Sequence, residues 1–151
     1  MISRPIEISR AVWGLALLGR PNQVLTRVHG LQIDRPSVVV ARILGARHVT
    51  QAVLSGVEPS PTVLAMGVWV DGSHALTALG LAVVDRSRAR AGLVDAAIAL
   101  TWAVVGWRDL GRPDRSSPHD ERRRDRLARA VLGVVPGGPP LLRRAARTGG
   151  C

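Results

Sequence analysis

Two long apolar runs joined by a short turn carry charged residues near their middles. The runs cover residues 37–57 and 62–84, with Glu58-Pro59-Ser60-Pro61 at the turn. Each run is about as long as a helix that crosses a bilayer. Charged side chains at that depth are costly in hydrocarbon and normally face other protein groups that pair with them. The pattern therefore favours a small membrane protein whose helices pack with their polar groups inside.

The charged residues are expected to pair across the helices. Folding the two runs back on each other as an antiparallel hairpin places Arg47 and His48 level with Asp71. Asp71 is therefore predicted to pair with Arg47 or His48. A third apolar run follows at residues 91–107, and the same antiparallel arrangement brings its Asp95 near the depth of Arg42, which predicts a second pair. The candidate buried polar layer, which also includes a histidine on the same helical face as Asp71, comprises Arg42, Arg47, His48, Asp71, His74 and Asp95.

Small residues recur at spacings of three and four along each of these runs. Such stripes let helix backbones approach closely inside a membrane. In the first run, the stripe also includes a histidine, which we expect to face another helix rather than lipid. The stripes are Ala41, Gly45, His48, Ala52 and Ser55 in the first run, Asp71, Ala75, Ala78 and Ala82 in the second, and Gly92, Ala96, Ala99 and Ala103 in the third.

The N-terminal segment leaves two structures open. Arg4 and Arg10 precede an apolar core at residues 11–19 that has the length of a signal-peptide core, but Arg20-Pro21 follows at once in place of a cleavage site. Residues 6–19 are thus expected to form a short helix. That helix either lies in the membrane interface or spans a locally thinned bilayer while packed against its neighbours. The connection at residues 20–36 is expected to be a solvated loop, and its His29 is given no metal role.

The composition changes after residue 107, where the positive charge is concentrated. The net charge is +10 and is carried by arginine alone. Ser117 followed by Pro118 is a helix-start signal, and we expect an amphipathic helix over about 118–134 with an apolar stripe of Leu127, Val131 and Val134. Pro and Gly residues then end it, and the last eleven residues are expected to be disordered. The arginines expected to contact anionic lipid or a partner are Arg122, Arg123, Arg124, Arg126 and Arg129.

Catalytic motifs are not found in the sequence. It contains no phosphate-binding glycine loop, no CxxC or HExxH pair and no G-x-S-x-G serine motif. Asp71, Ser73 and His74 stand close together in the sequence, but neighbouring positions are about 100° apart around a helix, which does not suit a catalytic triad. We therefore expect no catalytic residues, no cofactor and no metal site.

Two short patterns resemble a group of small membrane proteins from high-GC, mycobacterium-like bacteria. One is the opening Arg10-Ala11-x-Trp13-Gly14. The other is Ala41-Arg42-x-Leu44-Gly45-x-Arg47-x-x-x-Gln51-Ala52, followed by Val70-Asp71-x-x-His74-Ala75. The resemblance covers about residues 8–107 and implies a polytopic membrane protein, but the group brings no established activity. Abundant Ala, Gly, Val and Arg without Lys, Phe or Tyr also fits a GC-rich bacterial genome.

Together these observations predict an all-α protein: a membrane bundle of three or four short helices with a basic, partly disordered C-terminal tail. The membrane domain covers residues 1–107 and the tail 108–151, and the tail is assigned to the cytoplasm from its expected affinity for lipid. The Glu58–Pro61 turn has no positive charge and suits the non-cytoplasmic side, so the distribution of charge does not give one consistent orientation. The expected helices of the membrane domain are about 6–19, 37–57, 62–84 and 91–107.

Three functional classes remain. The first is a non-enzymatic membrane component that associates with itself or with other membrane proteins through its small-residue stripes. The second is a minor transporter, proton-path protein or small-ligand binder that uses the buried Arg/Asp/His layer. The third is a soluble helical nucleic-acid binder, which the tail supports only weakly because it has no aromatic residues for base stacking.

Overall fold

The computed structural model describes residues 5–55, 59–110 and 122–148, and within these ranges the chain is helical and contains no strand. The predicted all-α class is confirmed. The expected turn at Glu58 and the expected helix start at Ser117-Pro118 lie outside the described residues. The described elements are α1 (Pro5–Gly19), α2 (Pro21–Arg27), α3 (Arg35–Ser55), α4 (Pro61–Val84), η1 (Arg86–Arg88), α5 (Ala89–Asp109), α6 (Arg122–Val134) and α7 (Gly138–Thr148).

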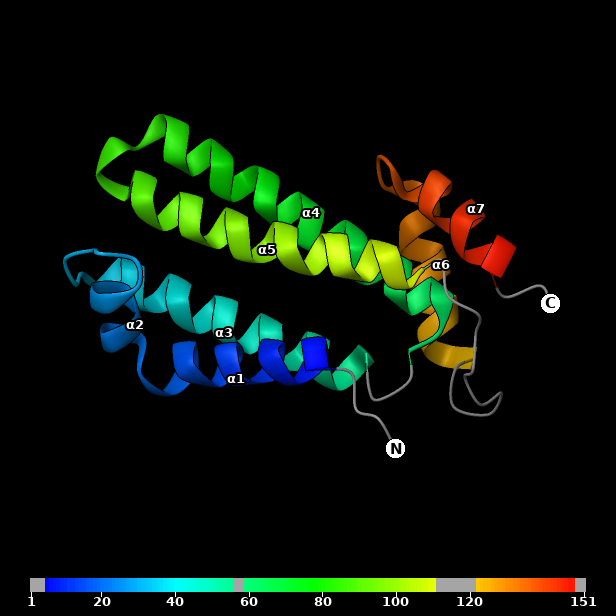
Figure 1. Ribbon diagram of the computed structural model, residues 1–151, viewed down its shortest axis with the longest axis horizontal. Coiled ribbons are helices and arrows are strands. Elements are labelled where there is room, and N and C mark those ends of the chain that lie inside the picture. Colours follow the sequence, from blue (N-terminus) through cyan, green and yellow to red (C-terminus); the bar gives the residue numbers. More distant parts are fainter. Residues whose placement is uncertain (1–4, 56–58, 111–121, 149–151) are drawn as a thin grey trace.

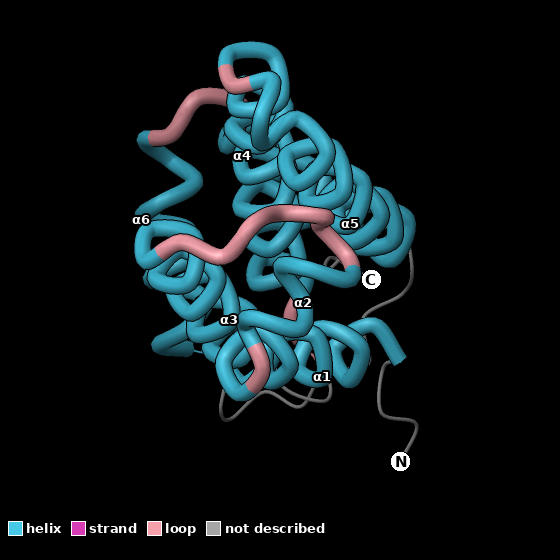
Figure 2. The backbone as a smooth tube through the Cα atoms, turned by 90° about the vertical axis from the view of Figure 1, so that its left-hand side faces the viewer, coloured by secondary structure: helices cyan, strands magenta, loops and turns pink. Residues whose placement is uncertain are grey.

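The four long helices form two antiparallel pairs. Helix α1 packs along α3 and α4 packs along α5, as Figure 1 shows. The view in Figure 2, turned by 90°, shows the two pairs as two stacked layers. The backbones of α3 and α4 come close over a short stretch only. The sequence predicts a central hairpin of α3 and α4, but in the structure α3 packs mainly on α1 and α4 mainly on α5.

Close backbone contacts at glycine positions explain why α1 pairs with α3 and α4 with α5. A Cβ atom added to Gly14 of α1 would lie 2.8 Å from the carbonyl oxygen of Gly45 in α3, and a Cβ atom on Gly45 would lie 2.7 Å from that of Gly14. In the other pair, a Cβ atom on Gly92 of α5 would lie 2.6 Å from the carbonyl oxygen of Ala78 in α4. Distances under 3.0 Å do not occur for real Cβ atoms, so each pair packs where its small-residue stripe meets another backbone.

Residues 20–36 contain a short helix where a loop was expected. Pro21 opens α2 at a position where proline is tolerated, and Val24 and Leu25 are buried against Leu17 and Ala41. After α2, Gly30 has a φ of 67°, which turns the chain back toward the start of α3. This segment therefore closes one end of the α1–α3 pair instead of lying free in solvent.

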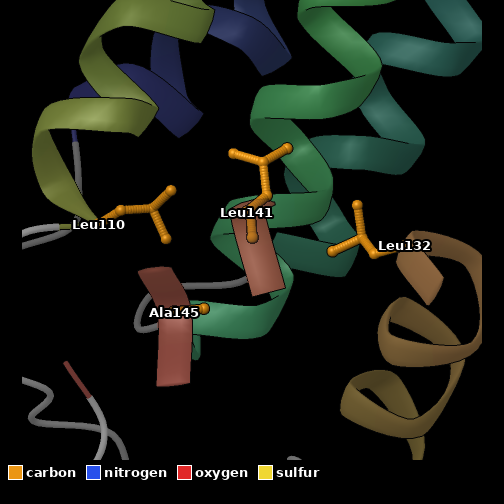
Figure 3. Close-up of a cluster of buried hydrophobic side chains, with 5 residues drawn as sticks. Leu110, Leu132, Leu141 and Ala145 are labelled. Atoms are coloured by element: carbon orange, nitrogen blue, oxygen red, sulfur yellow. The ribbon is translucent and has the colours of Figure 1, made fainter. Parts of the chain in front are cut away.

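The C-terminal residues form a second helix, α7, where disorder was expected. Pro139 and Pro140 stand in its first turn, where proline neither removes a needed hydrogen bond nor clashes. The glycines and prolines of this region thus separate two helices rather than end the ordered chain. Figure 3 shows what holds this hairpin: Leu132, Leu141 and Ala145 gather with Leu110. This cluster also buries Ala65 of α4, so the α6–α7 hairpin lies against the first turns of α4.

Helix α6 packs through a different face from the one predicted. Ala128 and Leu132 are buried, whereas Leu127 is 69% exposed and Val134 is 84% exposed. The apolar stripe predicted from the sequence therefore faces outward, for the most part. Three hydrogen bonds join α6 and the turn after it to the rest of the chain: Asp125 accepts from Ser60, Arg124 Nη1 donates to the Leu54 carbonyl over 3.0 Å, and Trp69 Nε1 donates to the Pro136 carbonyl over 2.8 Å.

Candidate functional site: a buried polar cluster between the helix pairs

Asp71 of α4 lies at the centre of a buried ionic cluster. Its side chain is 1% exposed. Arg10 Nη2 donates to Asp71 Oδ2 over 2.6 Å, and Arg47 Nη2 lies 3.6 Å from Asp71 Oδ1. Gln51 Nε2 donates to the same Oδ1 over 3.4 Å. We call Arg10, Arg47, Gln51 and Asp71 the Asp71 cluster.

The Asp71 cluster joins the two helix pairs. Arg10 comes from α1, Arg47 and Gln51 come from α3, and Asp71 comes from α4. Arg47 Nη2 also donates to the Val70 carbonyl over 2.9 Å, which ties α3 to α4 a second time. The backbones of α3 and α4 approach each other only briefly, so these polar side chains supply contacts between the layers that the backbones do not.

Aromatic rings enclose the cluster on the α5 side. The Arg10 guanidinium carbon lies 5.2 Å from the ring centroid of Trp102, within the range of a cation–π contact. The ring of His48 meets Trp102 edge-on, with centroids 4.7 Å apart, and lies 6.4 Å from the ring of His74. The structure thus places His48 and His74 beside the ionic groups, and within the described residues Asp71 pairs with Arg10 and Arg47 rather than with His48.

Several buried polar atoms around the cluster have no hydrogen-bond partner among the described residues. A cavity of about 10 Å³, roughly the space for one water molecule, lies beside Arg10 and Asp71. In an apolar interior, each unsatisfied group costs free energy comparable to a lost hydrogen bond. This arrangement can hold ordered water. The atoms are Arg10 Nε, Arg47 Nη1, His48 Nδ1 and Gln51 Oε1.

Asp95 pairs with His29 and not with Arg42. His29 Nε2 lies 3.1 Å from Asp95 Oδ1, and His29 Nδ1 lies 3.3 Å from the Val24 carbonyl. Burial of His29 disfavours its charged form, but the hydrogen bond and negative charge of Asp95 outweigh that effect, so the pKa of His29 is raised. Arg42 is exposed on the outer side of α3. The expected pair failed because depth along a helix says nothing about the direction in which a side chain points.

Sequence reasoning missed Arg10 as a member of the site. Its position before the apolar core suggested a flanking charge, yet its side chain is only 4% exposed. A signal was present in the spacing: Arg10, Gly14 and Leu17 follow one another at intervals of four and three, and all three are buried. The Glu7 carboxylate, 3.7 Å from Arg10 Nη1, lies on the same helical face.

Comparison with protein-family models, with curated proteins and with solved structures gives no match. Among the described residues, no group of three or more His, Cys, Asp or Glu side chains is arranged to hold a metal ion.

Proposed function

We propose that this chain is a multi-pass integral membrane protein with a non-enzymatic role, in which the Asp71 cluster holds two helix pairs together. One observation carries the proposal: the polarity of the helices is inverted relative to a water-soluble bundle. The interior of the four long helices contains Asp71, Arg10 and mostly small residues, with Leu17 and Trp102 as the large apolar exceptions, whereas many large apolar side chains point outward. The outward-facing side chains on α3, α4 and α5 include Val39, Ile43, Val53, Leu76, Val83, Leu93 and Leu100.

Helix length and composition support the same proposal. Pro61–Val84 and Arg86–Asp109 are long and apolar enough to cross a membrane. The core helix of a soluble protein passes the same test but is mostly buried. Here 17% of the apolar window in the first helix and 39% of that in the second are buried. Helices α1, with 15 residues, and α3, with 21, would join them as further spans, with Arg10 and Arg47 turned inward as buried charges require.

The small-residue stripes do not serve as the surface for partners in this proposal. Gly14, Gly45 and Gly92 are already occupied by contacts within each pair. Association with a second copy or with another membrane protein would therefore use the outer apolar faces of α3 and α4. The arginines of α6, together with exposed Leu127 and Val134, would rest on anionic lipid at the bundle end where α4 begins.

Extraction of membranes with alkaline carbonate tests insertion. The full-length protein should stay in the pellet, and its release into the supernatant would exclude the proposal. Cys151, the sole cysteine, then gives a label for the tail: an impermeant maleimide added to intact cells should not reach it if the tail is cytoplasmic. Replacing Cys151 with Ser and placing a cysteine at Val83 or Val84 provides the matched reporter for the opposite end of α4.

A second function, proton or small-ligand passage, is favoured by the partnerless polar atoms around the Asp71 cluster. Buried ionisable groups with space for water are typical of proton paths. Proteoliposomes that contain the protein and a pH-sensitive dye distinguish the two roles. An Asp71-dependent proton flux would establish passage as the function. A flux equal to that of empty vesicles would exclude passage and leave the first proposal, in which the Asp71 cluster only holds the helix pairs together.

A further inference from the structure

An open basin lies at the opposite end of the bundle from the α6–α7 hairpin. It is formed by the junction of α1 and α2, the residues just before α3, and the first two turns of α3. Its volume is about 930 Å³. Arg20, Arg35 and Arg42 line it from different parts of the chain, and we call it the arginine basin.

The positive charge of the arginine basin is not neutralised within the described residues. No ion pair joins Arg20, Arg35 or Arg42 to a carboxylate there. The one carboxylate in the lining, Asp34, is already engaged: Ser37 N donates to its Oδ1 over 2.7 Å, and Arg88 Nη2 donates to its Oδ2 over 3.0 Å. Arg88 lies outside the basin lining and is shared between Asp34 and Asp85. The lining itself holds three arginines against the single carboxylate of Asp34, so it stays net positive.

The arginines on α3 are spaced to face one ligand together with apolar side chains. Val38, Val39 and Arg42 stand three, four and seven residues after Arg35, so the four residues share one face of the helix. Arg35 and Arg42 lie about 10 Å apart along the helix axis. Arginine binds phosphate through two parallel hydrogen bonds from its planar guanidinium.

The position of Arg42 favours a lipid headgroup over a free anion as the source of a phosphate bound in the basin. On the outer surface of α3 it stands between Val39, which is 55% exposed, and Ile43, which is 62% exposed. In a membrane helix, an arginine with such neighbours extends toward the interface, where its charge meets lipid headgroups. A free anion from water would gain nothing from the exposed apolar side chains beside it, whereas the acyl chains of a lipid would cover them.

We propose that the arginine basin binds the phosphate of an anionic phospholipid headgroup, with the acyl chains against Val38 and Val39. The proposal rests on the membrane insertion proposed above. It adds a specific lipid site at the end of the bundle that α6 and α7 do not occupy. The arginines of α6 are expected to meet the membrane surface as a whole, whereas the basin would select one headgroup.

The test uses full-length protein in detergent and native mass spectrometry. Phosphatidylglycerol, phosphatidylcholine and inorganic phosphate are titrated separately. The wild type should retain phosphatidylglycerol in preference to the other two. The double variant Arg35→Gln/Arg42→Gln should bind phosphatidylglycerol about 30-fold more weakly, since each arginine at an anionic surface contributes about 1 kcal/mol and 1.4 kcal/mol is tenfold. The single variant Arg20→Gln, on a different part of the chain, should lose about fivefold by the same conversion.

Arg27→Gln/Arg86→Gln is the matched control. Both of these arginines are exposed at the same end of the molecule, and neither lines the basin. The control should keep the wild-type affinity, and circular dichroism should give all variants the same helix content. Equal loss in the control, or equal retention of phosphatidylcholine, would overturn the site. Displacement of the lipid by inorganic phosphate at similar concentration would identify a free-phosphate site instead.

Carbonate extraction of membranes from cells that express the same protein, done before detergent is added, separates this proposal from the previous one. If the wild-type protein stays in the membrane pellet but shows no preference for phosphatidylglycerol, only the proposed lipid site is contradicted. Release of the protein by carbonate would contradict both membrane insertion and the lipid site that rests on it.

Discussion

Gly14 and Gly45 pack backbone to backbone, with each occupying the space that a Cβ atom on the other would need. This contact lies at the centre of the α1–α3 pair and brings Arg10, one turn before Gly14, beside the opposite helix pair. The glycine contact and the Asp71 cluster therefore depend on each other: one sets the distance between the helices, and the other fixes them to α4.

Replacing Gly45 with Ala should separate α1 from α3. The added methyl group would lie 2.7 Å from the Gly14 carbonyl, and overpacking of this kind costs about 1–3 kcal/mol. Thermal unfolding in detergent measures the loss. Gly80→Ala is the control, because nothing lies within 4 Å of its added Cβ atom. The control should be neutral or slightly more stable, since alanine favours helix. Equal melting of the two variants would mean that α1 and α3 do not touch at this glycine.

Asp71→Asn should destabilise the protein strongly. Removing one partner of a buried pair commonly costs about 3–5 kcal/mol, because the remaining charges stay in an apolar interior. Unfolding of the purified protein by heat, followed by circular dichroism, gives the size of the effect.

Second substitutions identify the main partner of Asp71. Arg10 is the closer one, at 2.6 Å against 3.6 Å for Arg47. Arg10→Leu should therefore restore more of the stability lost in Asp71→Asn than Arg47→Leu does, which reveals direct coupling by non-additivity. Arg42→Leu removes the same charge from an exposed position and should restore nothing. Full rescue by Arg47→Leu alone would reverse the assignment.

The His29–Asp95 pair should make stability depend on pH. The pKa of His29 is raised in the folded chain, so protonation stabilises the fold. This contribution is complete below the ordinary histidine pKa of 6.5 and is lost as the pH rises through the higher folded value. Melting temperatures measured between about pH 5.5 and 8.5 should therefore fall on the alkaline side. Asp95→Asn should flatten the profile, whereas Arg86→Gln should lower or raise it without changing its shape. An unchanged slope in Asp95→Asn would exclude the pair as its cause.

The C-terminal hairpin offers a pair of identical substitutions on opposite faces of one helix. Leu132 is fully buried and Leu127 is 69% exposed. Leu132→Ala should cost about 2–5 kcal/mol of the stability of the hairpin, as buried Leu→Ala changes do. Its release should change the fluorescence of Trp69 and speed proteolysis of α6. Leu127→Ala should leave both measurements unchanged, and a similar effect of the two would argue against the packing face seen here.

The sequence predicted the helices better than it predicted their partners. The small-residue stripe through Gly45 correctly indicated a face that packs closely, but a stripe does not say which helix it meets. The predicted hairpin required α3 to pack on the next helix, α4. In the structure α3 packs on α1 instead, through the contact between Gly14 and Gly45. Asp71 and Arg47 lie close together as predicted. Asp95 pairs instead with His29, which belongs to the connection at residues 20–36 that was predicted to be a solvated loop. Side-chain direction decided each case, and it depends on rotation about the helix axis, which spacing alone does not define.

Because α3 and α4 approach each other only briefly, the contact between the two helix pairs at Asp71 is largely ionic, and its strength depends on whether water reaches it. Attraction between charges grows as water is excluded, whereas close packing of Gly14 on Gly45 changes little with the solvent. Water admitted to the Asp71 cluster would thus loosen one half of the molecule from the other and leave each helix pair intact. The two pairs would then depend on their remaining contacts, among them the His29–Asp95 and Arg88–Asp34 pairs.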